Sequence, residues 1–216
     1  MKKVAVVLAG CGVYDGAEIN EVVLTLLSLE QQGATYQCYA PNIDQMHVIN
    51  HLTGEEMAET RNVMIEAARI TRGNVMELAQ ANVADYDALI VPGGFGAAKN
   101  LSDFAIKGSA LTVQEDFLKL AQGFYQSGKP VGLICIAPTM AAKIFGAGVE
   151  CTVGNDAEVA EAIEATGGKH LECPVNEVII DQKNKLVTTP AYMLAGSISE
   201  AAIGISECVK QVIAMA

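Results

Sequence analysis

One cysteine of this sequence has surroundings that could make its thiol a nucleophile. Cys135 ends the apolar run 131–134, and Pro138, which suits the first turn of a helix, follows closely. A thiol on such a strand-to-helix bend lies beside unpaired backbone N–H groups, which favour the thiolate. The nucleophile elbow of hydrolases has this arrangement. A buried cysteine that ends a core strand explains the same residues equally well, so both interpretations stay open.

A glycine-rich segment, 92–96, follows a second apolar run. Gly93 and Gly94 lack a Cβ, so their N–H groups could approach a substrate oxygen closely. Together with the N–H of Ile136 they would form an oxyanion hole. A tight turn that only requires glycine accounts for the segment as well. A phosphate site is disfavoured, because neither a following Lys-Ser/Thr nor a Gly-x-Gly-x-x-Gly spacing is present.

Two carboxylates, Glu18 and Glu21, share one face of the first predicted helix. Carboxylates in a first helical turn are ordinary partners of the helix dipole, and this is the better interpretation for most of them. A carboxyl that faced the Cys135 thiol could instead hold a proton and transfer it, provided that burial raises its pKa. The spacing does not decide which glutamate does so.

The histidines do not complete a catalytic triad or a metal site. None of His47, His51 and His170 lies in a motif that would pair it with Cys135. His47 and His51 are four residues apart, but no third ligand is evident, so we expect no metal. The six cysteines are widely spaced without a Cys-x-x-Cys pair, which indicates free thiols.

The composition is that of a compact globular protein. Its 216 residues, 51% hydrophobic and only 18% charged, suffice for one core and predict a single domain over 1–216. The net charge of −11 without a basic cluster argues against nucleic acid as a partner. No apolar run is long enough to cross a bilayer, and the run after Lys3 stops at Gly10, unlike a signal peptide. We therefore expect no membrane anchor and a cytoplasmic location.

The elements that must position these residues follow from the hydrophobic pattern. Short apolar runs indicate buried parallel strands at 4–8, 35–40, 88–91 and 131–134. The segments between them have helical spacing, the clearest ending at Gly33. This alternation predicts an α/β fold with a doubly wound, mostly parallel sheet and helices on both faces. A ligand would then bind at the carboxyl ends of the strands.

Other segments depart from simple alternation. Residues 42–84 are predicted to be an insertion that acts as a lid or dimer surface, with a helix beginning at the capping box Thr53-Gly54-Glu55-Glu56. Residues 177–181 and 185–189 are predicted to form a hairpin. A long closing helix is expected over 197–215.

Three motifs together resemble one known family. They are Gly-Ala-Glu-Ile-Asn-Glu at 16–21, Pro-Gly-Gly-Phe-Gly-Ala-Ala-Lys-Asn-Leu at 92–101 and Cys-Ile-Ala-Pro at 135–138. They are similar to the deglycase/PfpI branch of the class I glutamine amidotransferase-like superfamily. The segments 10–16, 50–55 and 188–194 further resemble a bacterial glyoxalase group within it, and the match runs almost from end to end.

The resemblance implies a flavodoxin-like fold, a homodimer, Cys135 as the nucleophile and Glu21 as the glutamate that contacts it. It also implies glutathione-independent glyoxalase activity on a small dicarbonyl, which converts glyoxal to glycolate or methylglyoxal to lactate without a cofactor. Protease-like relatives have His directly after the cysteine, whereas this sequence has Ile136. This departure argues against protease activity.

A second class of function is compatible with the same thiol. A cysteine of low pKa at this turn could be a redox sensor that is oxidised to sulfenic or sulfinic acid. The protein would then be a chaperone-like stress protein, and its dicarbonyl turnover would be incidental.

Overall fold

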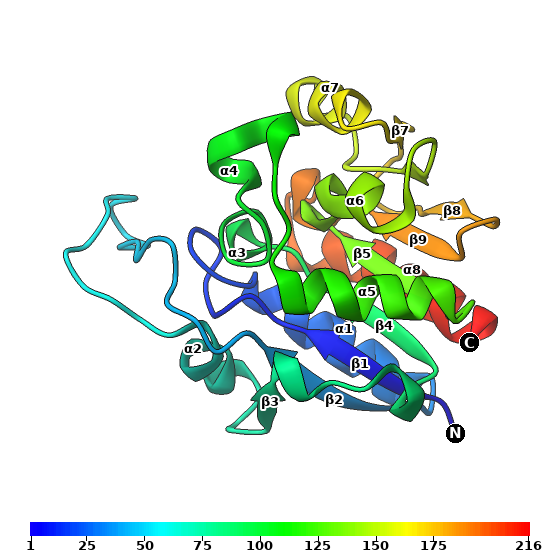
Figure 1. Ribbon diagram of the computed structural model, residues 1–216, viewed down its shortest axis with the longest axis horizontal. Coiled ribbons are helices and arrows are strands. Elements are labelled where there is room, and N and C mark those ends of the chain that lie inside the picture. The colour runs from blue at the N-terminus through cyan, green and yellow to red at the C-terminus, as the bar shows by residue number, and fades with distance from the viewer.

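A seven-stranded sheet runs through the middle of the molecule in the computed structural model, which describes residues 1–216 (Figure 1). The strand order is β3-β2-β1-β4-β5-β9-β8, and all neighbours are parallel except β8, which is antiparallel to β9. Two short strands, β6 and β7, form a separate parallel pair. The strand bounds are β1 Lys3–Val7, β2 Thr35–Ala40, β3 Val75–Glu77, β4 Ala88–Val91, β5 Val131–Ile134, β6 Glu150–Cys151, β7 Lys169–His170, β8 Ile179–Asp181 and β9 Leu186–Thr189.

Helices cover both faces of the sheet, which confirms the predicted doubly wound α/β architecture. Helices α1 and α8 pack against each other on one face, while α5 and α6 lie on the other (Figure 1). None of the helices is both long and apolar enough to span a membrane. The helix bounds are α1 Ile19–Gln31, α2 Val63–Ile70, α3 Phe95–Lys99, α4 Phe104–Lys107, α5 Glu115–Gln126, α6 Ala141–Phe145, α7 Ala157–Ala165 and α8 Ile198–Met215.

The central strands are apolar along their whole length because helices cover both of their faces. Every residue of β4 and β5 is buried. These strands belong to one cluster of 52 buried hydrophobic residues, which also contains Phe117 and Phe124 of α5. Continuous apolar runs therefore predicted these strands at their observed bounds.

The chain from residue 177 onward also follows the sequence prediction. β8 and β9 form the expected hairpin, whose turn is closed by two hydrogen bonds from Asn184 to the Asp181 carboxylate. Helix α8 begins after Ser197, whose hydroxyl accepts a hydrogen bond from the N–H of Glu200 at 3.2 Å. This is the usual arrangement of an N-cap serine.

The prediction for residues 42–84 was wrong in part. No helix begins at Thr53, because its hydroxyl accepts from the N–H of Glu55 in a local turn and Gly54 has a φ of +75°. The helix of this region, α2, begins after Asn62, whose side chain accepts from the N–H of Ile65 at 3.1 Å. The same region supplies β3, which pairs with β2 at the edge of the sheet, so part of it belongs to the main architecture.

The carboxyl ends of the parallel strands place four loops at one edge of the sheet. These loops follow β1, β4, β5 and β9, and each contributes to the same cavity. Their contributions include Tyr14, Gly94, Cys135 and Tyr192, in that order. The predicted location of the ligand site thus coincides with a cavity of about 820 Å³.

Close packing of α8 on β9 gives a prediction for Gly204. An alanine in a helix interior is usually more stable than glycine by about 1 kcal/mol. Here the added Cβ would overlap the carbonyl oxygen of Val175 and lie 2.6 Å from Thr189 Oγ1. We expect Gly204→Ala to lower the free energy of unfolding by about 1 to 3 kcal/mol.

Urea denaturation of the variant beside a matched control will measure this effect. Gly123→Ala in α5 is the control, because its Cβ would meet only side-chain atoms of Val83, the nearer being Cγ2 at 2.7 Å, and no backbone atom. A Gly204→Ala protein that is as stable as the parent would contradict the tight packing of α8.

Candidate active site

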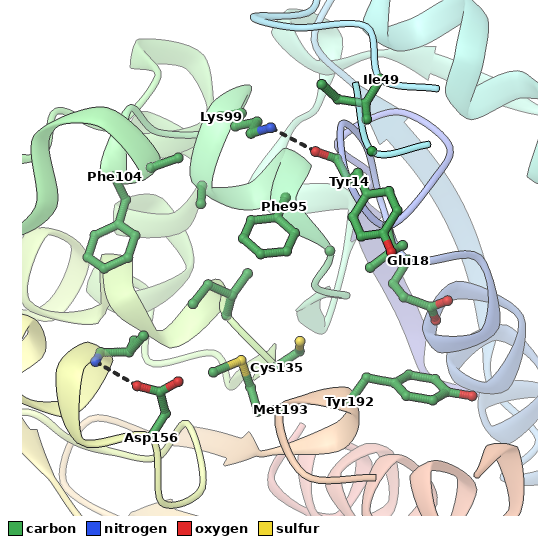
Figure 2. A pocket seen from close by; sticks show the side chains of 17 residues that line it. Tyr14, Glu18, Ile49, Phe95, Lys99, Phe104, Cys135, Asp156, Tyr192 and Met193 are labelled. Atoms are coloured by element: carbon green, nitrogen blue, oxygen red, sulfur yellow. Dashed lines mark hydrogen bonds between the residues drawn. The ribbon is translucent and has the colours of Figure 1, made fainter. Parts of the chain in front are cut away.

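Cys135 lies on a strained turn at the end of β5. Its φ is +62°, a conformation that L-residues rarely adopt, and its N–H donates to the carbonyl of Thr189 at 3.0 Å. A 3₁₀ helix, η4 (Ala137–Met140), follows directly with Pro138 in its first turn. The turn directs the sulfur into the cavity, although only 7% of the residue is exposed (Figure 2). The predicted strand-to-helix elbow is therefore present.

Glu21 is the glutamate that contacts the thiol. It is fully buried and forms a hydrogen bond with Cys135. Its two carboxyl oxygens accept from the N–H groups of Gly93 at 2.8 Å and Tyr192 at 3.2 Å. Glu18 instead caps α1, since its carboxylate accepts from the N–H of Glu21 at 2.7 Å, and it also lines the cavity.

The two acids are coupled by burial. Burial raises the pKa of the Glu21 carboxyl from 4.5 to about 7, against the hydrogen bonds that it accepts. Burial, and then the charge of Glu21, raise the pKa of the Cys135 thiol well above its ordinary value. The backbone N–H groups of Gly94 and Ile136 donate to the sulfur and act in the opposite direction. The pair therefore gives up its first proton near neutral pH and holds its second strongly.

The expected fall of the thiol pKa is not observed. The helical segment that follows Cys135 begins as the 3₁₀ helix η4 and continues into α6, and its N-terminus offers the N–H of Ile136 to the sulfur. Desolvation and the neighbouring Glu21 outweigh that hydrogen bond. The thiolate must consequently form by transfer of a proton within the pair.

The glycines of segment 92–96 have separate tasks. The N–H of Gly93 is already bonded to Glu21, so it orients the carboxyl and does not face the cavity. A Cβ on Gly93 would overlap Cys135 Cβ and lie 2.8 Å from Glu21 Oε2, which explains why a glycine is needed. Gly94, with a φ of +92°, and Ile136 are left as the donors beside the sulfur.

The cavity above the sulfur has a volume of about 820 Å³ and is mostly apolar. Figure 2 shows Cys135 with Met193 beside it, Phe95 above, and Phe104 farther to one side. Twelve of the 17 lining residues are hydrophobic; the full set is Val13, Tyr14, Glu18, Ile49, Gly54, Gly94, Phe95, Ala98, Lys99, Phe104, Ala105, Cys135, Ile136, Asp156, Val159, Tyr192 and Met193.

Sequence reasoning missed four residues of the site and its surroundings. Tyr192 acts through its backbone N–H, and Asn20 holds its ring by donating to the hydroxyl at 3.2 Å. The segment 188–194 carried part of the family resemblance, but a backbone donor leaves no mark in residue type. Phe104 and Asp156 reach the cavity from segments with no motif, so no sequence signal pointed to them.

The histidines lie apart from this centre. His51 accepts from the N–H of Tyr14, His170 accepts from the N–H of Val153, and none of the three histidines lines the cavity. Nowhere do three His, Cys, Asp or Glu side chains gather as a metal site would require. All six cysteines are free, and only Cys11 is partly exposed.

The raised pKa of Glu21 predicts a specific dependence of stability on pH. The unfolded chain releases the proton near pH 4.5, whereas the folded protein keeps it up to about 7. The stabilisation is therefore complete below about pH 4.5 and is lost as the pH rises through 7, a change of roughly 3 kcal/mol. Glu21→Gln, which cannot titrate, should lack this change.

Urea unfolding of both proteins across this pH range tests the prediction. The amide group introduced by Glu21→Gln leaves one backbone N–H without an acceptor, but that loss is the same at every pH. Only the difference in pH slope is compared, and parallel profiles would show that Glu21 has no raised pKa.

Comparison with curated proteins finds close relatives along almost the whole chain. A human protein, "Glutamine amidotransferase-like class 1 domain-containing protein 3, mitochondrial", is 48% identical over 98% of this chain and 82% of its own length. The zebrafish "ES1 protein, mitochondrial" is 32% identical over 88% of this chain and 76% of its own length. These names contradict the expected cytoplasmic location. That expectation rested on the apolar pattern after Lys3 and on the lengths of the apolar runs, and neither identifies the compartment of a folded protein.

Solved structures agree with the sequence relatives. An "isoprenoid biosynthesis protein with amidotransferase-like domain" from Ehrlichia chaffeensis has a TM-score of 0.93 and 34% identity, covering 100% of this chain and 99% of that one. Glyoxalase III from Candida albicans, with a TM-score of 0.62 and 14% identity over 99% of this chain and 97% of that one, shows the fold alone. Residues 2–195 match the model of the DJ-1/PfpI family. This chain therefore belongs to the DJ-1/PfpI family.

Proposed function

We propose that this protein is a glutathione-independent glyoxalase that converts a small dicarbonyl to a hydroxy acid. The observation that carries the proposal is the buried hydrogen bond between Glu21, with a pKa of about 7, and the Cys135 thiol at the floor of the cavity. A nucleophile and a base of near-neutral pKa in direct contact are what this chemistry requires. The sequence motifs that resemble bacterial ElbB glyoxalases support the same assignment.

The first step is addition of the thiol to an aldehyde carbon. Glu21 accepts the thiol proton as the sulfur attacks, and a hemithioacetal forms at Cys135. The N–H groups of Gly94 and Ile136, which already face the sulfur, are placed to donate to the oxyanion. Protonated Glu21 then returns the proton to this oxygen.

The second step moves a proton between the two carbons of the substrate. Glu21 removes the hydrogen of the hemithioacetal carbon and delivers a proton to the neighbouring carbon. The hydroxyl proton of the first carbon passes to the oxygen of the second, which leaves a thioester on Cys135. Water then hydrolyses the thioester, releasing glycolate from glyoxal or lactate from methylglyoxal. One carbon is oxidised and its neighbour is reduced, so the sequence consumes only water and balances without a cofactor.

We expect Cys135→Ala to abolish glycolate formation from glyoxal and Glu21→Gln to lower kcat about 100-fold to 10,000-fold. The assay is glycolate formation without glutathione. Cys11→Ala is the matched control, because Cys11 is the partly exposed cysteine that unspecific adduct formation would use first. Equal rates in all four proteins would refute the glyoxalase assignment.

The pH profile gives a second, independent prediction. Only the ionised carboxylate of Glu21 can accept the thiol proton, so kcat/KM should rise as the pH increases through about 7. The residual activity of Glu21→Gln should lack this rise. A parental profile that is flat between about pH 6 and 8 would exclude Glu21 as the base.

The alternative, a redox sensor, receives less support from the geometry. Oxidation by peroxide requires an exposed thiolate, whereas Cys135 is 7% exposed and its pKa is raised. The homodimer that the resemblance implies also stays a prediction. A surface for it is available on α1, where Ile19, Val23 and Leu27 follow one another at four-residue spacing and are each nearly half exposed.

A further inference from the structure

The cavity is far larger than the smallest substrate of a glyoxalase. Its volume is about 820 Å³, within the range of sites that hold drug-sized molecules. Glyoxal has four non-hydrogen atoms and fills the space of about three water molecules at about 30 Å³ each. A substrate of that size would leave most of an apolar cavity filled with water.

We propose that the physiological substrate class is a neutral α-oxoaldehyde with an apolar alkyl or aryl substituent of several carbons. The proposal rests on the proposed function for the reacting end of the molecule, and it adds a subsite for the other end. This subsite is the apolar part of the cavity beside Cys135, and it is formed by Phe95, Phe104, Ile136, Val159 and Met193.

The arrangement of the walls gives the substrate one orientation. The carbonyl oxygen is held by the N–H groups of Gly94 and Ile136 beside the sulfur. Glu18 and Tyr192 lie on one side of Cys135, and Phe104 and Asp156 lie on the other (Figure 2). The substituent therefore extends toward Phe104, whose ring and the ring of Phe95 offer apolar surface to it.

The charges around the cavity favour a neutral substituent. Glu18 and Asp156 both line it, and a like charge on the substrate would be repelled. The single cation of the lining, Lys99, donates to the carbonyl oxygen of Tyr14 at 2.8 Å. Burial lowers the pKa of the Lys99 ammonium, which is the reverse of what a site built for an anion would do. Phosphorylated or carboxylated oxoaldehydes are thus disfavoured.

The first test measures kcat/KM for a series of neutral α-oxoaldehydes. The series consists of glyoxal and the glyoxals that carry a methyl, propyl, hexyl or phenyl substituent. Each methylene that enters the subsite should raise kcat/KM about fourfold until the space is filled. A hexyl-length analogue that ends in a carboxylate should be at least about tenfold poorer than its neutral counterpart. Turnover that is flat or falls with chain length, while glyoxal is converted, would overturn the substrate class and leave the proposed function intact.

Two variants locate the effect at the subsite. Phe104→Ala removes part of the wall and should reduce the preference for hexyl over methyl about tenfold. Val159→Phe fills part of the subsite, so it should also reduce the preference for hexyl over methyl, here by excluding the longer substituent. Because ratios are compared within one protein, a general loss of folded enzyme does not change them. Ratios equal to that of the parent in both variants would contradict the assignment.

A binding measurement separates this proposal from the proposed function. The probes are two hydroxyketones that lack the aldehyde, hydroxyacetone and 1-hydroxy-2-octanone. The readout is the dissociation constant of each probe, measured by isothermal titration calorimetry. Binding of the octanone that is at least tenfold tighter than that of hydroxyacetone, and that is weakened by Phe104→Ala, supports the subsite even if no oxoaldehyde is turned over. Equal affinity for both probes, or no binding of either, overturns it.

Discussion

The buried contact between Glu21 and Cys135 is the interaction on which the rest of the structure depends. The carboxyl comes from the first turn of α1 and the sulfur from the end of β5. The two meet only because Gly93 between them has no Cβ, since any side chain there would overlap Cys135. The register of β1, β4 and β5, and the packing of α1 on the sheet, together fix the contact.

The surrounding backbone completes this contact at some cost in strain. Cys135 and Ala191 both have positive φ values, +62° and +45°, although neither is glycine. Each such residue is unfavourable by about 1 to 3 kcal/mol and persists only where its surroundings hold it. Cys135 is held by its bond to Thr189, and the turn at Ala191 delivers the N–H of Tyr192 to Glu21. The strain therefore positions the donors and the acid of the site.

Electrostatics then determine what the pair can do. The Glu21 carboxyl and the Cys135 thiol lie together in a buried site, where both cannot easily be ionised at once. They therefore share one proton, and the pair carries about one negative charge. The carboxyl pKa of about 7 makes Glu21 a base of useful strength near neutral pH. The apolar walls formed by Phe95, Phe104 and Met193 keep the dielectric low and provide room for more than the reacting atoms.

The sequence by itself determined the layered fold and the turn that carries Cys135. β4 and β5 are buried on both faces and therefore read as continuous apolar runs, and the elbow at Cys135 follows from an apolar run that ends before a proline. The helix expected at Thr53 failed because a local turn competes for the hydroxyl that would have capped it.

Only the tertiary structure decided which glutamate meets the sulfur and how both titrate. Glu18 and Glu21 share one face of α1 in the sequence pattern, yet only Glu21 is fully buried against Gly93 and Tyr192. The sequence suggested that the pKa of the Cys135 thiol would be lowered, but it is raised. Desolvation and the charge of a neighbouring residue cause this shift, and both depend on what is packed around the thiol. The spacing of residues along the chain records neither the desolvation of a group nor the charge beside it, because both come from residues that are distant in sequence and adjacent in space.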